Sequence, residues 1–254
     1  MLPAERKSLI VETIAQQGSV TVDQLVTLTG VSGCTIRRDL DNLAAQGLVD
    51  RTHGGAVLPR TGTSYERLYP EKRSLHLKEK QRIGKAAAAL VTDGETIILD
   101  SGSTTLEVAR FLTNRKNLTI ITNDLFIATE VQYDPTTLIL VTGGILRPGF
   151  NVLQGSAAEA MIRSVNVDKA FIGGDAVDVI VGVTNATFAE ASLKQLMLAA
   201  AREAYLVVDH TKFGKRALAQ VAPLDRFTAI LTDAGLAAEH RMALVGAQIR
   251  FETV

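Results

Sequence analysis

The residues best suited to binding a small anion form one polar run, DSGSTT, directly after the apolar stretch TIILD. Its glycine permits a tight turn and a close approach to a ligand, and its hydroxyl residues fall where the next helix should begin. Unpaired N–H groups at a helix N-terminus attract phosphate, although a Ser or Thr that only caps the helix would look the same. The candidate phosphate-binding residues are Asp100, Ser101, Gly102, Ser103, Thr104 and Thr105.

Two lysines could add positive charge to this site, Lys194 in FAEASLKQLMLAAA and Lys212 in DHTKFG. Each has a simpler explanation. Glu190 lies one helical turn before Lys194, so these two could form a surface pair, and Lys212 could be an exposed loop residue. Neither G-x-G-x-x-G nor G-x-x-x-x-G-K-[ST] occurs, so a small phosphorylated compound is favoured over a dinucleotide or ATP.

The elements that position these residues alternate between apolar runs and helical stretches. Strands are predicted at 96–100, 118–122, 137–141, 169–173, 204–209 and 228–233, and a helix at 77–91. Apolar strands separated by helices indicate a doubly wound, mostly parallel α/β sheet covered on both faces. Ligands bind beyond the carboxyl ends of such strands. Polar or small residues that follow other strands are Asn123, Gly143, Gly144, Gly173, Gly174, Asp175 and Asp209.

The first sixty residues show three helical patterns, with a helix-turn-helix unit at about 20–39. In the third pattern, Ile36, Leu40 and Leu43 form the buried stripe. The opposite side presents small side chains and arginines, which suits a recognition helix in the major groove. Alternatively, the arginines only pair with acids on a solvated helix. The candidate DNA-binding residues of this helix are Ser32, Cys34, Thr35, Arg37 and Arg38.

A small hairpin, or wing, is predicted next in LVDRTHGGAVL, with its turn at 53–55. Arg51 and His53 would lie near its tip and could contact the DNA backbone or the minor groove. We therefore predict a DNA-binding domain at 3–58. The Pro- and Gly-containing stretch 59–76 has no clear period and is predicted as a linker, followed by an α/β effector domain at 77–254.

Composition narrows the class of protein. The 254 residues carry no formal net charge, and no run of about eighteen apolar residues indicates a membrane span. The single cysteine excludes an internal disulfide and a cysteine-based zinc cluster, and the four histidines lack ligand spacing, so no metal or other cofactor is expected. We expect a cytoplasmic protein.

At this point the residues show a long resemblance to the DeoR family of bacterial sugar-catabolism regulators. Its DNA-binding pattern is matched by Ser32, Thr35, Arg37, Arg38, Asp39, Leu40, His53, Gly54, Gly55 and Ala56. Its effector-domain motifs are matched by Asp100, Gly102, Ser103, Thr104, Thr122, Asn123, Gly143, Gly144, Glu190, Ala191, Lys194, Asp209, Thr211, Lys212, Phe213 and Gly214.

The resemblance implies an effector domain similar in fold to ribose-5-phosphate isomerase and glucosamine-6-phosphate deaminase. It further implies that the GSTT loop and Lys194 take the effector's phosphate. The residues placed to read hydroxyls would be Asp100, Asn123, Glu190 and Asp209. One departure follows FIGG, where Val177, Asp178 and Val179 replace a Gly-Ile-Asp-like stretch of the family; it bears on which sugar is bound.

Three functions are compatible with these patterns. The first is a non-enzymatic repressor of a carbohydrate-catabolism operon, a homodimer or homotetramer whose operator binding is modulated by a phosphorylated sugar or sugar acid. The second is an active sugar-phosphate isomerase or deaminase with a DNA-binding arm, because fold does not settle function. Its candidate acid–base residues would be Asp100, Asp175, Asp178, Glu190 and Lys194. The third is a DNA-binding structural protein without a ligand.

Overall fold

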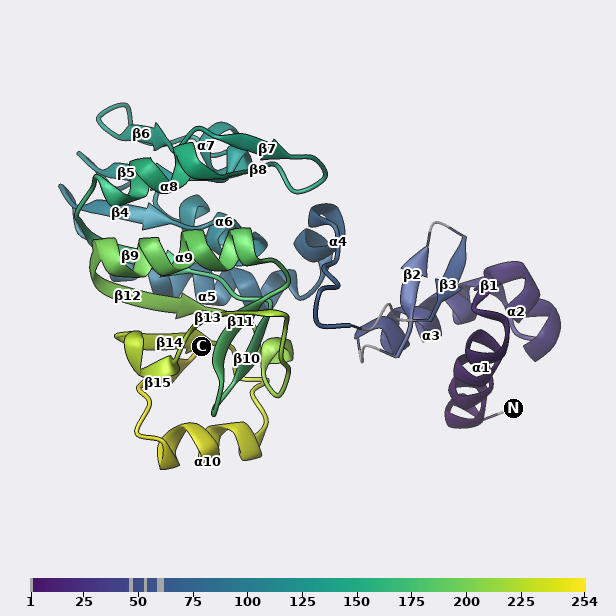
Figure 1. The fold of residues 1–254 in the computed structure, drawn as a ribbon. Helices are drawn as coiled ribbons and strands as arrows, with labels where there is room; N and C mark the ends of the chain where they lie inside the picture. Colours follow the sequence, from purple (N-terminus) through teal and green to yellow (C-terminus); the bar gives the residue numbers. More distant parts are fainter. Residues whose placement is uncertain (1, 46–47, 53, 59–61) are drawn as a thin grey trace. The chain divides into compact units, whose positions relative to one another are not determined.

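The computed structural model describes residues 2–45, 48–52, 54–58 and 62–254. The chain divides into two compact units, Met1–Gly62 and Thr63–Val254. Each has its own hydrophobic core, which in the first is built on Ile10, Leu25, Ile36 and Leu40. The two units are described separately below, and their elements are labelled in Figure 1.

The N-terminal unit is a winged helix-turn-helix domain. Its helices are α1 (Pro3–Gln17), α2 (Val22–Thr29) and α3 (Gly33–Ala45), and its strands are β1 (Ser19–Thr21), β2 (Asp50–Thr52) and β3 (Gly55–Val57). Thr21 caps α2 by accepting a 3.1 Å hydrogen bond from the Gln24 amide, and Gly30 ends α2 with a left-handed φ of 71°. The predicted helix-turn-helix is therefore confirmed.

The predicted wing is present as the antiparallel pair β2–β3, and β1 adds a third strand that the sequence patterns did not indicate. Gly55 is required here, because a Cβ atom at this position would lie 1.9 Å from the Val20 carbonyl oxygen. The close approach of β1 to β3 thus explains the second glycine of the Gly-Gly pair.

The second unit contains a seven-stranded sheet in the order β15-β14-β12-β9-β4-β5-β6, with every neighbouring pair parallel. The strands are β4 (Thr96–Leu99), β5 (Thr119–Thr122), β6 (Leu138–Val141), β9 (Val167–Ile172), β12 (Ala201–Val207), β14 (Ala229–Thr232) and β15 (Phe251–Thr253). The six predicted strands are confirmed, and β15 was not predicted.

Helices cover both faces of this sheet (Figure 1). They are α5 (Leu77–Ala89), α6 (Ser103–Arg110), α7 (Leu125–Glu130), α8 (Ser156–Arg163), α9 (Phe188–Ala200) and α10 (Ala238–Gly246). Alternation along β4 shows the two faces: Ile97 and Leu99 join the core under α5 and α6, whereas Ile98 joins the core under α8 and α9. The doubly wound class is confirmed.

Three smaller features complete the second unit. The hairpin β7 (Ile145–Arg147)–β8 (Val152–Gln154) follows β6, and a separate antiparallel sheet joins β10 (Ala176–Asp178), β11 (Gly182–Asn185) and β13 (Ala219–Ala222). Two 3-10 turns span His210–Lys212 and Leu224–Arg226. In the part of the chain that the structure describes, no helix is long and apolar enough to cross a membrane.

The predicted linker at 59–76 is corrected over most of its length. Residues 63–76 belong to the second unit and include helix α4 (Tyr69–Ser74), whereas residues 59–61 lie outside the described part. Tyr69 is buried and stacks on Phe126 with 4.6 Å between ring centroids. The sequence patterns missed this because a six-residue helix is too short to show a period, and its anchors are single side chains.

Candidate DNA-contacting helix and effector pocket

Helix α3 presents the predicted DNA-binding side chains on its solvent face. Cys34, Arg37 and Arg38 are exposed, whereas Ile36 and Leu40 are fully buried. The Ser32 hydroxyl accepts a 3.3 Å hydrogen bond from the Thr35 amide, so Ser32 caps the start of α3. The N-terminal turn of α3 is thereby fixed with small residues and two arginines outward, as a recognition helix requires.

A buried ion pair holds α3 against α1. Arg6 Nε donates a 2.5 Å hydrogen bond to Asp39 Oδ2, and both side chains are buried. The Asp39 bond raises the pKa of Arg6, which keeps the guanidinium charged. Asp39 follows Arg38 directly, so the ion pair fixes which side of α3 turns inward and leaves the two arginines facing outward.

Of the two predicted wing residues, Arg51 and His53, the structure describes only Arg51. Arg51 is half-buried and bridges the hairpin to α3. Its guanidinium donates a 2.9 Å hydrogen bond to the Gly55 carbonyl, and its Nε lies 3.0 Å from Asp41 Oδ1. Asp41 thus pairs with the wing. His53 lies outside the described residues.

In the second unit, a pocket forms at the carboxyl ends of β4 and β9. It is lined by Glu66, Tyr69, Lys72, Ser101, Gly102, Ser103, Thr104, Thr105, Phe150, Val152, Gly173, Gly174, Asp175, Asn185, Glu190, Lys194, Val207, Val208 and Lys212. The structure therefore brings the whole GSTT loop together with both predicted lysines and with Glu190.

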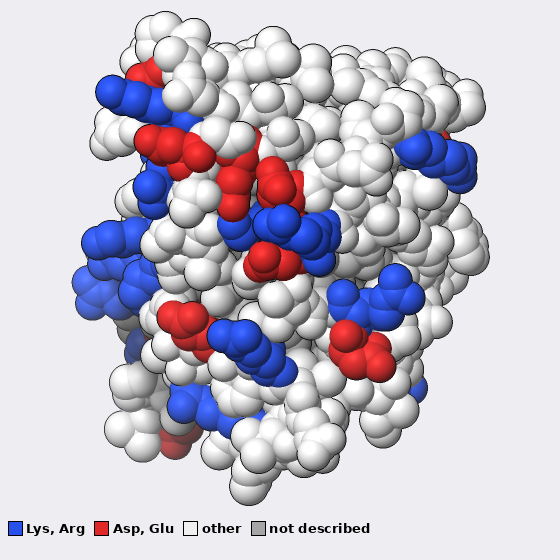
Figure 2. Space-filling model, turned by 90° about the vertical axis from the view of Figure 1, so that its left-hand side faces the viewer, with Lys and Arg blue, Asp and Glu red and all other residues white. Residues whose placement is uncertain are grey.

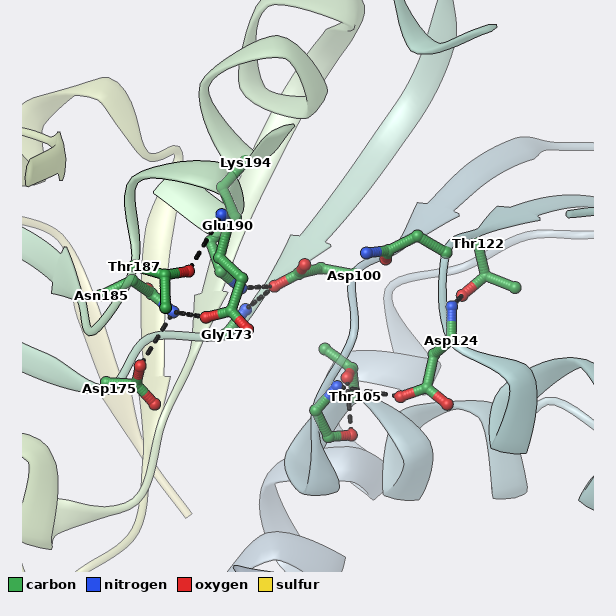
Figure 3. A network of polar contacts seen from close by, with 12 residues as sticks. Asp100, Thr105, Thr122, Asp124, Gly173, Asp175, Asn185, Thr187, Glu190 and Lys194 are labelled. Carbon is green, nitrogen blue, oxygen red and sulfur yellow. Dashed lines mark hydrogen bonds and ion pairs between the residues drawn. The ribbon is translucent and has the colours of Figure 1, made fainter. Parts of the chain in front are cut away.

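The GSTT loop opens helix α6 without a side-chain cap. Its N-cap residue is Gly102, which has no side chain to accept a bond from the helix amides. The Thr105 hydroxyl instead donates 2.9 Å back to the Gly102 carbonyl, and the Gly102 amide donates 3.2 Å to Asp124 Oδ2 (Figure 3). The alternative in which Ser or Thr only caps this helix is therefore not what the structure shows.

Asp124 is a buried residue that follows β5 and was not among the predicted effector-binding residues. It also caps α7, accepting 2.8 Å from the Phe126 amide and 3.2 Å from the Ile127 amide. Burial raises the pKa of Asp124 to about 6 against these hydrogen bonds, which lower it. One carboxyl group thus ties the GSTT loop to helix α7.

Lys194 projects from α9 toward the end of β4, where its ammonium group forms an ion pair with Asp100 Oδ2 (Figure 3). Asp100 also accepts 2.9 Å from the Gly173 amide. Both charged side chains are buried, and Glu190 is only 6% exposed. The simple reading of Glu190 and Lys194 as a surface pair is therefore wrong, because the helix face that carries them lies against the sheet edge.

Glu190, on the same helix as Lys194, belongs to a second group of polar residues. Its carboxylate accepts hydrogen bonds of 2.5 Å from Arg147 Nη1 and 3.2 Å from the side-chain nitrogen of Asn185. Thr187 caps the helix by accepting a hydrogen bond from the Glu190 backbone amide. Burial raises the pKa of Glu190, and the nearby carboxylates of Glu66 and Asp175 add to the effect.

Further charged residues belong to the pocket, and the sequence patterns indicated only one of them. Lys72 Nζ lies 2.6 Å from Glu66 Oε1 and 2.8 Å from Asp175 Oδ1, and Arg147 lies 2.6 Å from Glu66 Oε2. Burial opposes the ionisation of Asp175, but Lys72 and Lys212 outweigh it and lower its pKa. Only Asp175 gave a signal in the sequence, its place after a strand.

Five predicted effector-binding residues are not among those that line this pocket: Asp100, which pairs with the lining residue Lys194, and four residues at other strand ends. Asn123 is buried and donates 3.2 Å to the Leu153 carbonyl, which holds β8 beside β5. Asp209 is buried and caps the following 3-10 turn by accepting 3.0 Å from the Thr211 amide. Gly143 and Gly144 follow β6, and a Cβ at Gly144 would lie 2.5 Å from the Gln154 carbonyl oxygen. In this structure the four residues shape the strand ends.

The departure at 177–179 also has a structural explanation. Val177 is buried in β10, and Asp178 turns the β10–β11 hairpin by accepting 2.9 Å from each of the Ile180 and Val181 amides. Arg216 lies 2.8 Å from Asp178 Oδ2. The stretch therefore builds a hairpin, and Asp178 does not line the pocket.

Three carboxylates of the pocket, those of Glu66, Asp175 and Glu190, lie close enough together to hold a metal ion. Lys72 and Arg147 already lie between these carboxylates and satisfy their charge. A divalent metal ion would have to displace the Lys72 and Arg147 side chains, so these carboxylates fit an ion-pair network better than a metal centre.

Comparisons with known proteins agree with this geometry. Residues 6–61 match the DeoR-like helix-turn-helix domain, and residues 75–234 match the DeoR C terminal sensor domain. The HTH-type transcriptional regulator GlpR of Haloferax volcanii is 36% identical over 249 residues, which cover 98% of this chain and 97% of the relative. The glycerol-3-phosphate regulon repressor of Escherichia coli is 33% identical over 234 residues, which cover 92% of each chain.

A solved D-ribose-5-phosphate isomerase, in complex with phospho-erythronic acid, is 18% identical with a TM-score of 0.40, and 54% of each chain is covered. The full-length relatives are transcriptional regulators, which supports the regulator over the enzyme alternative. A sensor domain model over the second unit disfavours a purely structural DNA-binding protein. The two domain matches and the full-length identity together show that this chain belongs to the DeoR family of helix-turn-helix transcriptional regulators.

Proposed function

We propose that the protein is a repressor of a carbohydrate-catabolism operon whose operator binding responds to a phosphorylated sugar or sugar acid bound in the sensor pocket. The observation that carries the proposal is the convergence of the GSTT loop and Lys194 on one pocket. A glycine-capped helix start beside a buried lysine is suited to an anion with several acceptor oxygens. Glu190 and Asn185, on the same pocket, are suited to sugar hydroxyls.

Ion pairing within the pocket supports an anionic effector. Lys194 is paired with Asp100, so a phosphate group could pair with Lys194 in place of, or together with, Asp100. The Escherichia coli relative named above is a repressor of the glycerol-3-phosphate regulon, a regulon named for a phosphorylated compound. Both points favour a phosphorylated ligand over a neutral sugar.

The proposal includes a homodimer or homotetramer. Helix-turn-helix proteins bind two half-sites, and the half-site spacing follows the two-fold axis of the dimer. The face shown in Figure 2 carries Lys, Arg, Asp and Glu in small mixed groups, with no broad patch of one sign. Contact between copies would therefore not meet strong like-charge repulsion on that face.

The decisive experiment is the melting temperature of the full chain against a panel of phosphorylated sugars and sugar acids, with the unphosphorylated parents as controls. A ligand that binds only the native state stabilises it by about 2.7 kcal/mol at a hundredfold excess over Kd. We expect one phosphorylated compound to raise the melting temperature and its parent to have no effect. The shift should disappear in Lys194→Ala.

Lys85→Ala is the matched control, because Lys85 is exposed on α5 and lies outside the pocket. It should keep the full shift. A shift that persists in Lys194→Ala, or that the unphosphorylated parent produces equally, would contradict the phosphate site.

A further inference from the structure

Glu66 forms an unusual contact in the sensor pocket, because one carboxylate joins two cations from different elements. Its Oε1 lies 2.6 Å from Lys72 of α4, and its Oε2 lies 2.6 Å from Arg147 of β7. The Glu66 side chain is only 6% exposed. Each carboxylate oxygen of Glu66 is therefore paired with a cation, as the oxygens of a bound carboxylate or phosphate would be.

The two cations are held in place by other groups as well. Arg147 lies over the Phe150 ring at 3.7 Å from its centroid, and Lys72 lies over the same ring at 5.9 Å. Asp175 holds Lys72, and Glu190 holds Arg147. If Glu66 left, the cations would stay beside Phe150 with an anion position open between them.

Glu66 also lies in a special place along the chain. Only Thr63, Ser64 and Tyr65 separate it from Gly62, where the DNA-binding unit ends. The segment is attached at its ends by backbone bonds, from the Leu218 amide to the Thr63 carbonyl at 2.8 Å and from the Tyr69 amide to the Gly149 carbonyl at 3.4 Å. Between these bonds, the Glu66 carboxylate is its buried charged anchor.

We propose that Glu66 is a built-in competitor of the effector: it occupies, between Lys72 and Arg147, a position that an anionic group of the effector takes, and its displacement frees the segment that leads to the DNA-binding unit. The exchange is electrostatically balanced, because the incoming anion keeps both cations paired while Glu66 moves into water. The inference rests on the proposed function, since it needs an anionic effector in this pocket. It adds the regulatory step, which begins at Glu66.

Inorganic phosphate is a suitable probe, because without the rest of the effector it can enter either anion position, the GSTT loop beside Lys194 or the gap between Lys72 and Arg147. Its dissociation constant would be measured by calorimetry for the full-length wild type, Glu66→Gln, Glu71→Gln and Lys194→Ala. Hydrogen exchange of the Leu218 and Tyr69 amides would be followed with and without phosphate. Glu71 is the matched control, since it is exposed on the adjoining helix α4 and loses the same charge on substitution.

We expect Glu66→Gln to bind phosphate roughly tenfold more tightly than the wild type, because the competing side chain has lost its negative charge. The two amides should exchange faster in Glu66→Gln before phosphate is added, and in the wild type only after it is added. Glu71→Gln should behave as the wild type in both measurements.

The outcomes separate the two proposals. Phosphate binding that is lost in Lys194→Ala but equal in the wild type, Glu66→Gln and Glu71→Gln would overturn the competition and leave the phosphate site intact. Tighter binding in Glu66→Gln without a change in amide exchange would overturn the release of the segment. Absence of phosphate binding in every variant would contradict both the competition and the proposed effector class.

Discussion

At the scale of single residues, the sensor unit is organised by buried charges whose partners lie far away along the chain. Lys194 pairs with Asp100 and Lys72 with Asp175, so these two cations of the pocket are balanced before any ligand binds. Removing one member of a buried pair leaves an uncompensated charge, which is strongly destabilising. An anionic ligand avoids this loss, because it replaces one partner by another.

Asp124 gives a prediction with a definite sign. Its pKa is raised from 3.8 to about 6 by burial, so between these pH values the folded state holds a proton that the unfolded state has lost. Stability from this group therefore decreases as pH rises from about 4 to about 6. Asn at this position keeps an acceptor for the α7 amides and removes the titration.

We expect the difference in unfolding free energy, wild type minus Asp124→Asn, to fall over that pH window and to be flat above it. Urea denaturation at a series of pH values measures this difference. Asp134→Asn is the control, because Asp134 is only half-buried and its bonds to Thr136 lower its pKa. A pH-independent difference for Asp124→Asn would show that the folded-state pKa is not raised.

At the scale of elements, close packing of α5 holds α6, the helix that starts at the GSTT loop. Gly84 makes the approach possible, since a Cβ there would lie 2.6 Å from the Glu107 carbonyl carbon and 2.8 Å from its oxygen. Because backbone atoms block the position, the helices would have to move apart. The usual gain from replacing Gly by Ala within a helix is about 1 kcal/mol and would be outweighed.

We therefore expect Gly84→Ala to lower the unfolding free energy by about 1–3 kcal/mol and to weaken ligand-induced stabilisation, because α6 begins with the GSTT loop. Thermal and chemical denaturation measure the first effect. Gly246→Ala is the paired control, since Gly246 lies at the end of α10 with open space around its Cβ position. If both variants were equally stable, the close approach of α5 and α6 would not be rigid.

At the scale of the whole molecule, two units with separate cores match two domain models, a DeoR-like helix-turn-helix domain and a DeoR C terminal sensor domain. Helix α3 supplies the exposed arginines, and the second unit supplies the pocket. Substitutions in one unit should therefore leave the other unit's binding intact.

This division predicts that DNA binding and ligand binding can be lost separately. Arg38→Ala should weaken binding to DNA selected by the wild-type protein by more than about 1 kcal/mol, if Arg38 reads a base, and should keep the ligand-induced rise in melting temperature. Lys194→Ala should keep DNA binding in the absence of ligand and lose that rise. Arg163→Ala, an exposed arginine of α8 paired with Glu159, is the control for lost charge. Wild-type DNA affinity in Arg38→Ala would remove the role assigned to it.

Local patterns in the sequence were sufficient for the framework. Apolar periodicity located the helix-turn-helix and six parallel strands, and the Gly-Gly pair located the wing. The GSTT loop could be placed because a turn after a buried strand is encoded by adjacent residues. Short elements such as α4 and β15 were missed, because they are held by contacts with distant segments and have too few residues to show a period.

The tertiary structure alone decided the charged partners in the pocket. The sequence patterns placed Glu66 and Lys72 in a predicted linker and singled out nothing at Arg147, and they placed Glu190 and Lys194 one helical turn apart. Only the folded chain sets Lys72 beside Asp175, 103 positions away, and Glu66 beside Arg147, 81 positions away. The physical reason is that secondary structure follows from the preferences of neighbouring residues, whereas the pairing of a buried charge depends on which distant segments the fold brings within contact of it.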